Sequence, residues 1–384
     1  MKPLFKGAHY EEDPEQFPTT PRKDRSLGVI KLVTALVIFM AGGVIGLSVN
    51  THFSRYLGSQ TELFFPTTRY IEECLSIESY IEPKQLKHQM TDEELFWRGS
   101  MVPKKADFPY KRVPKVAFMF LTRGALPLGP LWERFFHGHE GLFTVYVHAL
   151  PGYKLNVTEN SAFYGRQIPS QDVSWGSVSL VDAEKRLMGN ALLDFSNERF
   201  VLLSESCIPV FNFPTVYKYL INSEQSYVES YDDPSHRGRG RYSRSMAPEI
   251  SLYQWRKGSE WFEMSRELAI DIVSDSKYYS IFRRYCKPSC YPDEHYIPTY
   301  LNMFHGELNA NRTVTWVDWS RLGPHPAQFG RADVNETFIQ SIRNNGTICT
   351  YNSKPTSVCF LFARKFAPSA LEPLLKISQT VMKF

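Results

Sequence analysis

A carboxylate that can act as a base lies at Glu294, in the segment Pro292-Asp293-Glu294-His295. Pro292 and Asp293 suit the first turn of a helix, because proline already has a helical φ angle and the first turn does not need its missing N–H group. The helix would hold Glu294 on a rigid backbone at its N-terminus, where the carboxylate can take a proton from a hydroxyl group. The simpler alternative is an acidic residue that only stabilises the helix dipole.

Cations near the end of the chain have a position suited to binding phosphate. Arg364 and Lys365 follow an apolar run, and Arg343 lies upstream of them. Guanidinium and ammonium groups of this kind can neutralise a diphosphate. Thr122 and the segment 204–209 also follow apolar runs. Because open α/β sheets bind ligands beyond the carboxyl ends of their strands, we expect these residues near one ligand site.

Apolar runs alternate with helical patterns over the part of the chain after residue 113. The continuous apolar runs predict buried strands of a largely parallel sheet, with helices between them. The predicted strands are 116–121, 143–148, 200–203, 313–319 and 358–363. The predicted helices are a short one at 91–98, then 181–195, 215–221, 261–273, one that begins at Pro292, and 368–381. This alternation indicates the α/β class.

One span is long and apolar enough to cross a membrane. Residues 32–49 carry no charged side chain, and 27–30 with Lys31 extend them. The polar tail before the span holds Arg22, Lys23 and Arg25, so the positive-inside rule keeps the N-terminus in the cytosol. We therefore expect a type II membrane protein with a single span. Its predicted parts are a cytosolic tail (1–26), a signal anchor (27–49), a stem and lead-in (50–112) and a luminal domain (113–384) that holds Glu294.

Glycosylation sequons and cysteines agree with this topology, because all of them follow the span. The sequons begin at Asn156, Asn311, Asn335 and Asn345. The cysteines are Cys74, Cys207, Cys286, Cys290, Cys349 and Cys359. Six cysteines allow fifteen disulfide pairings, and the sequence does not choose among them. A zinc site is less well supported, because Cys286 and Cys290 have no second pair of ligands at a suitable spacing.

The charge of the chain gives no reason to expect binding to nucleic acid. The formal net charge is +4 on 384 residues, and one short basic cluster covers residues 236–244. Two interpretations of this cluster stay open, a solvated flexible loop and a loop that grips an anionic ligand.

Several segments, taken in order along residues 113–370, resemble the core-2/I-branching enzyme family, glycosyltransferase family 14, and more closely its plant members. They are 115–124, 174–176, 200–209, 229–236, 255–262, 292–295, 316–319 with 323–326, and 362–366. The resemblance implies a GT-A-like fold, a Rossmann-like mixed sheet flanked by helices. It also implies inverting transfer of a sugar from a UDP-sugar to a glycan or glycoprotein acceptor. We expect such an enzyme in the Golgi membrane with its catalytic domain in the lumen.

The resemblance also implies roles for single residues. Glu294 matches the catalytic base, and Glu229 matches an acceptor-binding carboxylate. Lys365 matches the diphosphate-binding lysine, and Arg343 nearly matches its partner arginine, with Arg364 as a rival. The scheme is chemically coherent, because direct displacement at the anomeric carbon needs a base for the attacking hydroxyl and positive charge for the departing UDP.

The sequence departs from the usual GT-A pattern in two ways. Most GT-A enzymes bind a metal through Asp-x-Asp, which this sequence lacks, and the nearest substitute is Asp182-Ala-Glu184. We therefore expect Lys365 and Arg343, with Thr122, at the UDP site and no metal cofactor. Animal members have an aspartate where this chain has Val147-His148-Ala149, so uridine contacts cannot be carried over there. The donor sugar stays open among N-acetylglucosamine, glucuronic acid and xylose.

Three residues near 316–319 have two possible uses each. Trp316 and Trp319 can stack on acceptor sugar rings or can pack in the core. Asp318 can bind the acceptor or can close a local turn at the end of a strand.

Two alternatives from other classes of protein remain. A non-catalytic, membrane-anchored glycan-binding protein would keep the fold and the tryptophans, but would not need Glu294 and Lys365 together. A glycoside hydrolase needs two carboxylates that face one bond, and Glu229 and Glu294 are the candidates. The cations Arg343 and Lys365 favour a phosphate ligand instead.

Overall fold

The structure is a computed structural model that describes residues 31–49, 77–83, 85–105, 107–287, 290–321, 323–344 and 346–384. Two compact units divide the chain, Met1–Glu73 and Cys74–Phe384. In the first unit, the helix Lys31–Val49 is long and apolar enough to cross a membrane. This agrees with the predicted signal anchor at 27–49. The predicted cytosolic tail lies outside the described residues.

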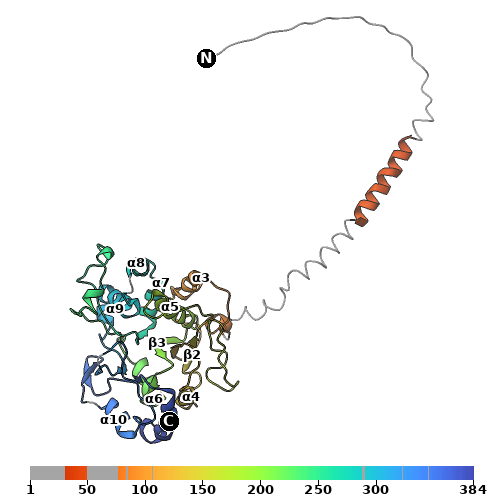
Figure 1. Cartoon of the computed structure of the whole chain (residues 1–384). Helices are drawn as coiled ribbons and strands as arrows, with labels where there is room; N and C mark the ends of the chain where they lie inside the picture. Colours follow the sequence, from red (N-terminus) through yellow and green to blue (C-terminus); the bar gives the residue numbers. More distant parts are fainter. Residues whose placement is uncertain are drawn as a thin grey trace, which may run out of the picture. The chain divides into compact units, whose positions relative to one another are not determined.

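A four-stranded sheet forms the centre of the second unit (Figure 1). Its order is β2-β1-β3-β5, with β1 (Lys115–Leu121), β2 (Phe143–His148) and β3 (Asn197–Ser204) parallel and β5 (Glu263–Ser265) antiparallel to β3. Every residue of β1 is buried, as expected for a strand that is covered on both faces. The three apolar runs that predicted strands at 116–121, 143–148 and 200–203 are therefore confirmed.

A smaller sheet and a hairpin come mostly from the C-terminal part of the chain. The sheet has the order β4-β9-β6, with β4 (Ile208–Pro209), β9 (Phe362–Arg364) and β6 (Thr315–Val317). The hairpin joins β7 (Cys349–Tyr351) and β8 (Lys354–Thr356). The strands predicted at 313–319 and 358–363 exist as β6 and β9, but both are shorter than predicted.

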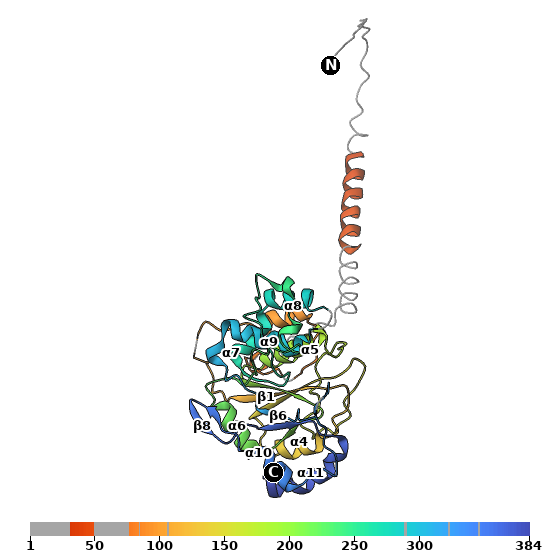
Figure 2. The same cartoon turned by 60° about the vertical axis from the view of Figure 1, so that its left-hand side comes forward.

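Helices cover the strands on two sides. Figure 2 shows α5, α7, α8 and α9 on one side of the strands and α4, α6, α10 and α11 on the other. The bounds are α2 (Ile77–Ile81), α3 (Asp92–Gly99), α4 (Gly129–Phe136), α5 (Val178–Leu192), α6 (Phe213–Ile221), α7 (Arg266–Ser274), α8 (Lys277–Tyr285), α9 (Pro292–Phe304), α10 (Glu336–Arg343) and α11 (Leu371–Ile377). Parallel strands flanked by helices confirm the predicted α/β class.

One predicted helix begins too early. The sequence indicated a helix over 261–273, but residues 263–265 form β5 and the helix α7 starts only at Arg266. The reason is a buried ion pair, in which Arg199 of β3 donates two hydrogen bonds of 2.6 Å to the Glu263 carboxylate. This pair and the ladder with β3 hold Glu263 in extended backbone. Ser265 then caps the helix by accepting from the Leu268 N–H.

The lead-in from residue 77 onward packs against the domain. Thr91 caps α3 in a capping box with Glu94, as the run of acidic residues after Thr91 suggested. Arg186 of α5 donates two hydrogen bonds to Asp92, at 2.8 and 2.7 Å. A bidentate pair of this kind fixes the orientation of α3 on α5.

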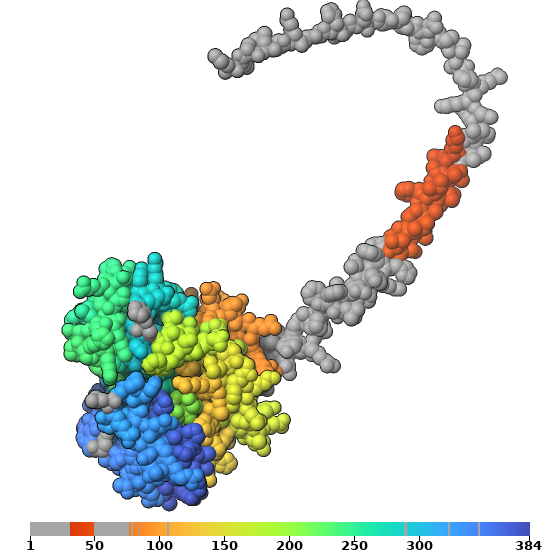
Figure 3. Space-filling view, viewed as in Figure 1, coloured from red at the N-terminus to blue at the C-terminus, as the bar shows by residue number. Residues whose placement is uncertain are grey.

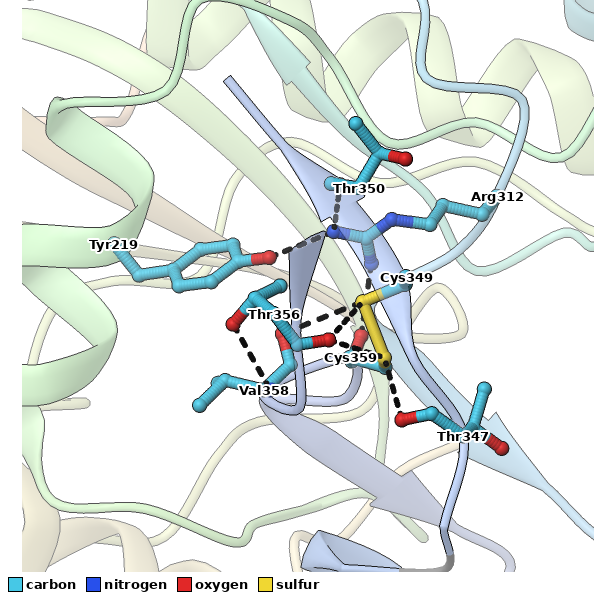
Figure 4. The surroundings of a disulfide bond; sticks show 8 residues. All are labelled: Tyr219, Arg312, Thr347, Cys349, Thr350, Thr356, Val358 and Cys359. Atoms are coloured by element: carbon cyan, nitrogen blue, oxygen red, sulfur yellow. Dashed lines mark hydrogen bonds between the residues drawn. A yellow bond between two sulfur atoms is a disulfide. The ribbon is translucent and has the colours of Figure 1, made fainter. Parts of the chain in front are cut away.

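Two disulfides join cysteines of the second unit. Cys286 pairs with Cys290, and Cys349 pairs with Cys359. Cys207 is buried and free, and Cys74 lies outside the described residues. Figure 4 shows the bond of Cys349 and Cys359 beside Arg312, whose guanidinium donates to the Cys359 carbonyl at 2.9 Å. This bond and Arg312 hold the β7–β8 hairpin to the rest of the domain.

Candidate functional site

A cavity of about 1140 Å³ lies at the carboxyl ends of the strands. Among the residues that line it, Thr122 follows β1, Ser204 ends β3, and Arg364 and Lys365 end or follow β9. Other lining residues come from 229–261, from the start of α9 and from 313–326. In Figure 3 the middle of the chain, in green and cyan, lies against the C-terminal part, in blue. The cavity therefore lies at the edge of the sheet where the sequence predicted a ligand site.

The helix α9 presents Glu294 to this cavity. It begins at Pro292, as predicted, and the preceding residue, Tyr291, has a left-handed backbone with φ of 56°. The Glu294 N–H donates to the Tyr291 carbonyl at 2.9 Å, which closes the first turn. Glu294 and its neighbour Asp293 both line the cavity. The N-terminus of α9 therefore places Glu294 at the wall of the cavity.

Two cations contact the Glu294 carboxylate. Its Oε2 accepts from Lys257 Nζ at 2.7 Å and from Arg241 Nη1 at 2.6 Å. Burial raises the pKa of Glu294, but Lys257 and then Arg241 oppose it, so that the pKa lies below its ordinary value. Glu294 is consequently ionised at neutral pH, as a general base must be.

A close approach of backbone brings Glu229 to the same cavity. Gly258 donates its N–H to the Glu294 carbonyl at 2.8 Å. A Cβ at Gly258 would lie 2.0 Å from the Glu229 carbonyl oxygen, so only glycine fits between the two segments. Burial raises the pKa of Glu229, and the charge of Lys257 opposes this rise. Lys257 therefore acts on both carboxylates.

His295 holds the segment that carries Lys257. Its ring is fully buried, stacks on Trp255 with centroids 4.4 Å apart, and bonds the Arg256 carbonyl through Nδ1 at 2.7 Å. Thr299 accepts from the Arg256 N–H at 3.0 Å. Burial lowers the pKa of His295 to about 4, so the imidazole stays neutral. This histidine anchors α9 to the segment 255–258 and has no contact with the cavity.

Three cations converge at another part of the cavity wall. Arg123, Arg364 and Lys365 all line the cavity. Burial lowers the pKa of Lys365, and the charges of Arg364 and Arg123 lower it further, against an opposing effect of Glu205. The Arg364 guanidinium lies over the Trp261 ring at 4.1 Å from its centroid. Cations that repel one another in a half-buried wall make a site for an anion.

The structure places Arg343 elsewhere. Its guanidinium donates to the Val381 carbonyl at 2.6 Å and lies over the Phe211 ring, 4.1 Å from the centroid. Arg343 is absent from the described residues that line the cavity. The end of α10 turns this side chain toward the C-terminal segment, so the predicted pairing of Arg343 with Lys365 is not seen. Arg364 and Arg123 occupy that position.

Of the three residues near 316–319 that were predicted to bind the acceptor, the two tryptophans line the cavity and Asp318 closes a turn. Trp316 and Trp319 line the cavity, and Trp319 is 53 % exposed. Trp316 also packs against Phe329 and Phe338, which matches the core-packing alternative. Asp318 accepts from the Ser320 N–H at 2.8 Å, which lowers its pKa and matches the turn-closing alternative.

Asp182 and Glu184 point to different surroundings. Asp182 accepts from Tyr279 and from Arg283, the latter at 2.9 Å, and Glu184 is fully buried in α5. Within the residues that the structure describes, no group of three or more His, Cys, Asp or Glu side chains could hold a metal ion. The two acids of this pair therefore do not face one common site.

Three predicted sequons lie at the surface. Asn156, Asn311 and Asn335 are exposed, and Asn345 lies outside the described residues. Asn335 also caps α10 by accepting from the Phe338 N–H at 2.9 Å.

The basic cluster 236–244 contributes Arg241 and other residues to the cavity, and Arg241 forms an ion pair with Glu294.

Several cavity residues were not predicted from the sequence as site residues. They are Arg123, Trp175, Lys257, Glu260 and Asp293. Lys257 and Glu260 belong to the segment 255–262, which carried part of the family resemblance, but nothing in its residue types assigned them a role. Their positions depend on long-range backbone contacts such as that of Gly258.

Comparisons with known proteins identify the family of the chain. A family model described as "Core-2/I-Branching enzyme" matches residues 116–343. The chain is 36 % identical over 310 residues to "Glycosyltransferase BC10" of rice (Oryza sativa subsp. japonica), which covers 69 % of this chain and 76 % of that protein. Residues 116–343 include the segment of Lys257, the helix of Glu294 and all of β1 except Lys115. The chain therefore belongs to the Core-2/I-Branching enzyme family and is a glycosyltransferase by class.

Proposed function

We propose that this protein transfers a sugar from a UDP-sugar to a hydroxyl group of a glycan acceptor, with inversion at the anomeric carbon. Glu294 is the general base, and Lys365 with Arg364 and Arg123 binds the diphosphate. Glu229, Trp316 and Trp319 are proposed to bind the acceptor.

In the proposed reaction, the Glu294 carboxylate takes the proton of the acceptor hydroxyl. The oxygen then forms a bond to the anomeric carbon from one side while the bond to the β-phosphate oxygen breaks on the other, so the configuration inverts. UDP leaves with the electron pair of the broken bond. Positive charge that is already in place stabilises this departing diphosphate without further reorganisation.

The observation that carries the proposal is that one cavity holds both an ionised carboxylate and, at another part of its wall, a group of cations. An ionised carboxylate lies on the α9 side, with Lys257 bonded to it at 2.7 Å. The cations Arg364 and Lys365 lie at the β9 side of the same cavity. A glycoside hydrolase would need two carboxylates at one bond but has no use for converging cations.

The test uses the full chain, purified in detergent, with a panel of UDP-sugars and a mixture of glycan acceptors. Release of UDP that depends on acceptor supports the proposal. Hydrolysis of the glycan without any nucleotide sugar would contradict it and would favour the hydrolase alternative.

We further propose that the reaction needs no metal cofactor. The sequence has no Asp-x-Asp, and Lys365 with Arg364 and Arg123 can supply the charge that a metal would otherwise supply. UDP release should survive EDTA, whereas a strict requirement for Mn²⁺ would contradict this part of the proposal.

We also propose a type II topology in the Golgi membrane. The helix Lys31–Val49 follows a basic tail, and the exposed sequons lie after it. Protease added to sealed microsomes should remove only a short N-terminal piece and leave a fragment that is sensitive to endoglycosidase. Digestion of the bulk of the chain would contradict this topology.

A further inference from the structure

The segment before α5 presents a tryptophan on a tight turn. The Ser177 N–H donates to the Ser174 carbonyl at 3.1 Å, and the Ser174 N–H donates to the Ser179 hydroxyl at 2.9 Å. Gly176, the third residue of this turn, has a φ angle of 69°, the left-handed backbone that a type II turn requires at that position. The turn therefore fixes the backbone that carries Trp175 at the N-terminus of α5.

The Trp175 ring lines the cavity, and the residue is 59 % exposed. Its ring centroid lies 5.2 Å from that of Tyr291, in an edge-to-face arrangement, and 5.6 Å from that of His325. These contacts hold the ring in place but leave much of it open. The C–H groups of a sugar ring can pack on an open indole, because its π face carries partial negative charge.

Tyr291 connects this ring to the proposed base. The Arg241 guanidinium lies over the Tyr291 ring, 4.0 Å from its centroid, and Arg241 Nη1 donates to the Glu294 carboxylate at 2.6 Å. Tyr291 is also the residue directly before α9. Trp175 thus contacts the base side of the cavity. One aromatic ring and one guanidinium follow between Trp175 and Glu294 in this chain of contacts, so a sugar on the indole is set back from the base.

His325 connects the same indole to the segment that holds the proposed acceptor-binding tryptophans. The Ala327 N–H donates to the Asp318 carbonyl at 2.9 Å and closes a loop. This loop holds His325 and also Trp319, which lines the cavity. The cations of the proposed diphosphate site come from other segments, at the ends of β1 and β9. Trp175 therefore lies where the base segment and the proposed acceptor segment meet.

We propose that Trp175 binds a sugar ring of the acceptor other than the ring that receives the new sugar, and that the enzyme therefore prefers acceptors of two or more sugars. This inference rests on the proposed function and adds a binding residue and a minimum acceptor length to it. The hydroxyl that is glycosylated must reach Glu294, whereas a ring on Trp175 is set back behind Tyr291. An acceptor that spans both positions covers the open indole, and this apolar contact stabilises the complex.

Two other uses of Trp175 lead to different results. An indole that stacks on the uracil of UDP would act on nucleotide affinity and not on acceptor length. An indole that only joins the segments of Tyr291 and His325 would act on stability and on the turnover of every acceptor alike. The contacts with the segment before Glu294 and with the loop of Trp319 favour the acceptor over both of these uses.

The test uses the full chain in a detergent without sugar groups, with UDP-N-acetylglucosamine, UDP-glucuronic acid and UDP-xylose as donors. The acceptors are matched pairs, the methyl β-glycosides of galactose, glucose and xylose and those of their β-1,4-linked disaccharides. Release of UDP that depends on acceptor gives kcat and KM for each. For the pair with the fastest transfer, we expect the wild-type kcat/KM to be at least about tenfold higher for the disaccharide.

Variants of the indole test its part in this preference. Trp175→Ala and Trp175→Leu should each lower kcat/KM for the disaccharide about tenfold, mainly through KM, with little change for the monosaccharide or in the Kd of UDP. Trp175→Phe keeps a smaller ring and should keep part of the preference. Trp97→Ala is the matched control, because Trp97 is 69 % exposed on α3 and is absent from the described residues that line the cavity.

Each outcome decides a specific point. Equal kcat/KM for both members of a pair in the wild type would overturn the inference and leave the proposed function intact. So would a folded Trp175→Ala or Trp175→Leu variant that keeps the wild-type preference, binds UDP more weakly or loses activity toward both members equally. If neither variant folds, Trp175→Phe decides, and it must show a smaller preference than the wild type. A chain that releases no UDP with any of these pairs or with the glycan mixture would overturn the proposed function and this inference together.

Discussion

Lys257 donates a hydrogen bond of 2.7 Å to the Glu294 carboxylate, and the same ammonium group also acts on Glu229. The two carboxylates nevertheless differ. The pKa of Glu294 is lowered, because its direct bonds to Lys257 and Arg241 outweigh burial, while burial prevails at Glu229 and raises its pKa. Lys257 thus helps to keep the proposed base ionised, whereas burial leaves the proposed acceptor-binding group easier to protonate.

Lys257→Met should shift the pH dependence of the reaction. Without the ammonium group the pKa of Glu294 rises, so the base is protonated at a higher pH and the acid limb of the kcat/KM profile moves upward. Arg241 remains, so we expect a shift of roughly half to one pH unit. Profiles of wild type and variant between pH 4.5 and 8 measure this, with the exposed Lys154→Met as control. An acid limb that does not move would show that Lys257 does not tune the base.

Gly258→Ala should damage the site through its backbone. The added Cβ would lie 2.0 Å from the Glu229 carbonyl oxygen and 2.8 Å from Pro298, so the segments of Glu229 and α9 must separate. We expect a loss of about 2 kcal/mol or more in the free energy of unfolding, together with most of the activity. Gly306→Ala is the matched control, because a Cβ there meets no atom within 4 Å. Similar melting temperatures for the two variants would contradict this account.

Much of the fold can be read from local patterns. The strands β1, β2 and β3 are continuous apolar runs, and α9 begins where Pro292 permits it. Strand ends then indicate where a ligand binds, so Thr122 and Lys365 were expected at the site for a physical reason. These features depend on neighbours in the sequence or on a general property of parallel sheets.

The remaining features depend on tertiary contacts that no local pattern encodes. Residues 263–265 have helical spacing, but the pair of Arg199 and Glu263 keeps them extended. Arg343 has the right residue type for a diphosphate, yet the end of α10 directs it to Phe211. Lys257 reaches Glu294 only because Gly258 permits a close backbone approach. Pairing of this kind between distant segments requires the three-dimensional structure.

Glu184→Gln should change the pH dependence of stability. The raised pKa of Glu184 means that the folded protein keeps a proton that the unfolded chain loses above its ordinary pKa, so this group destabilises the wild type increasingly as pH rises. Glutamine has no such proton. The melting temperature of the variant relative to wild type should therefore be higher at pH 8 than at pH 5, by roughly 2 °C or more. A difference that is the same at both pH values would contradict the raised pKa.

Loss of the Cys349–Cys359 bond should loosen the β7–β8 hairpin. The two cysteines are 10 positions apart in the sequence. Removal of a disulfide that closes a loop of this size lowers the free energy of unfolding by about 2 to 3 kcal/mol. Cys349→Ser, Cys359→Ser and the double variant should lose similar amounts in chemical denaturation, because each removes the same bond. Additive losses in the double variant would indicate that the two cysteines act independently.

The most direct test of the central claim is the kinetics of Glu294→Gln. Glutamine keeps the shape of the side chain but cannot take the proton of the acceptor, so UDP release that depends on acceptor should fall by roughly 10² to 10⁴. The affinity for UDP should barely change, because the proposed diphosphate site is at Lys365 and not at Glu294. Lys365→Ala should weaken both UDP binding and turnover. Transfer that survives in a folded Glu294→Gln variant would contradict the account and would leave Glu294 as a residue that stabilises the helix terminus.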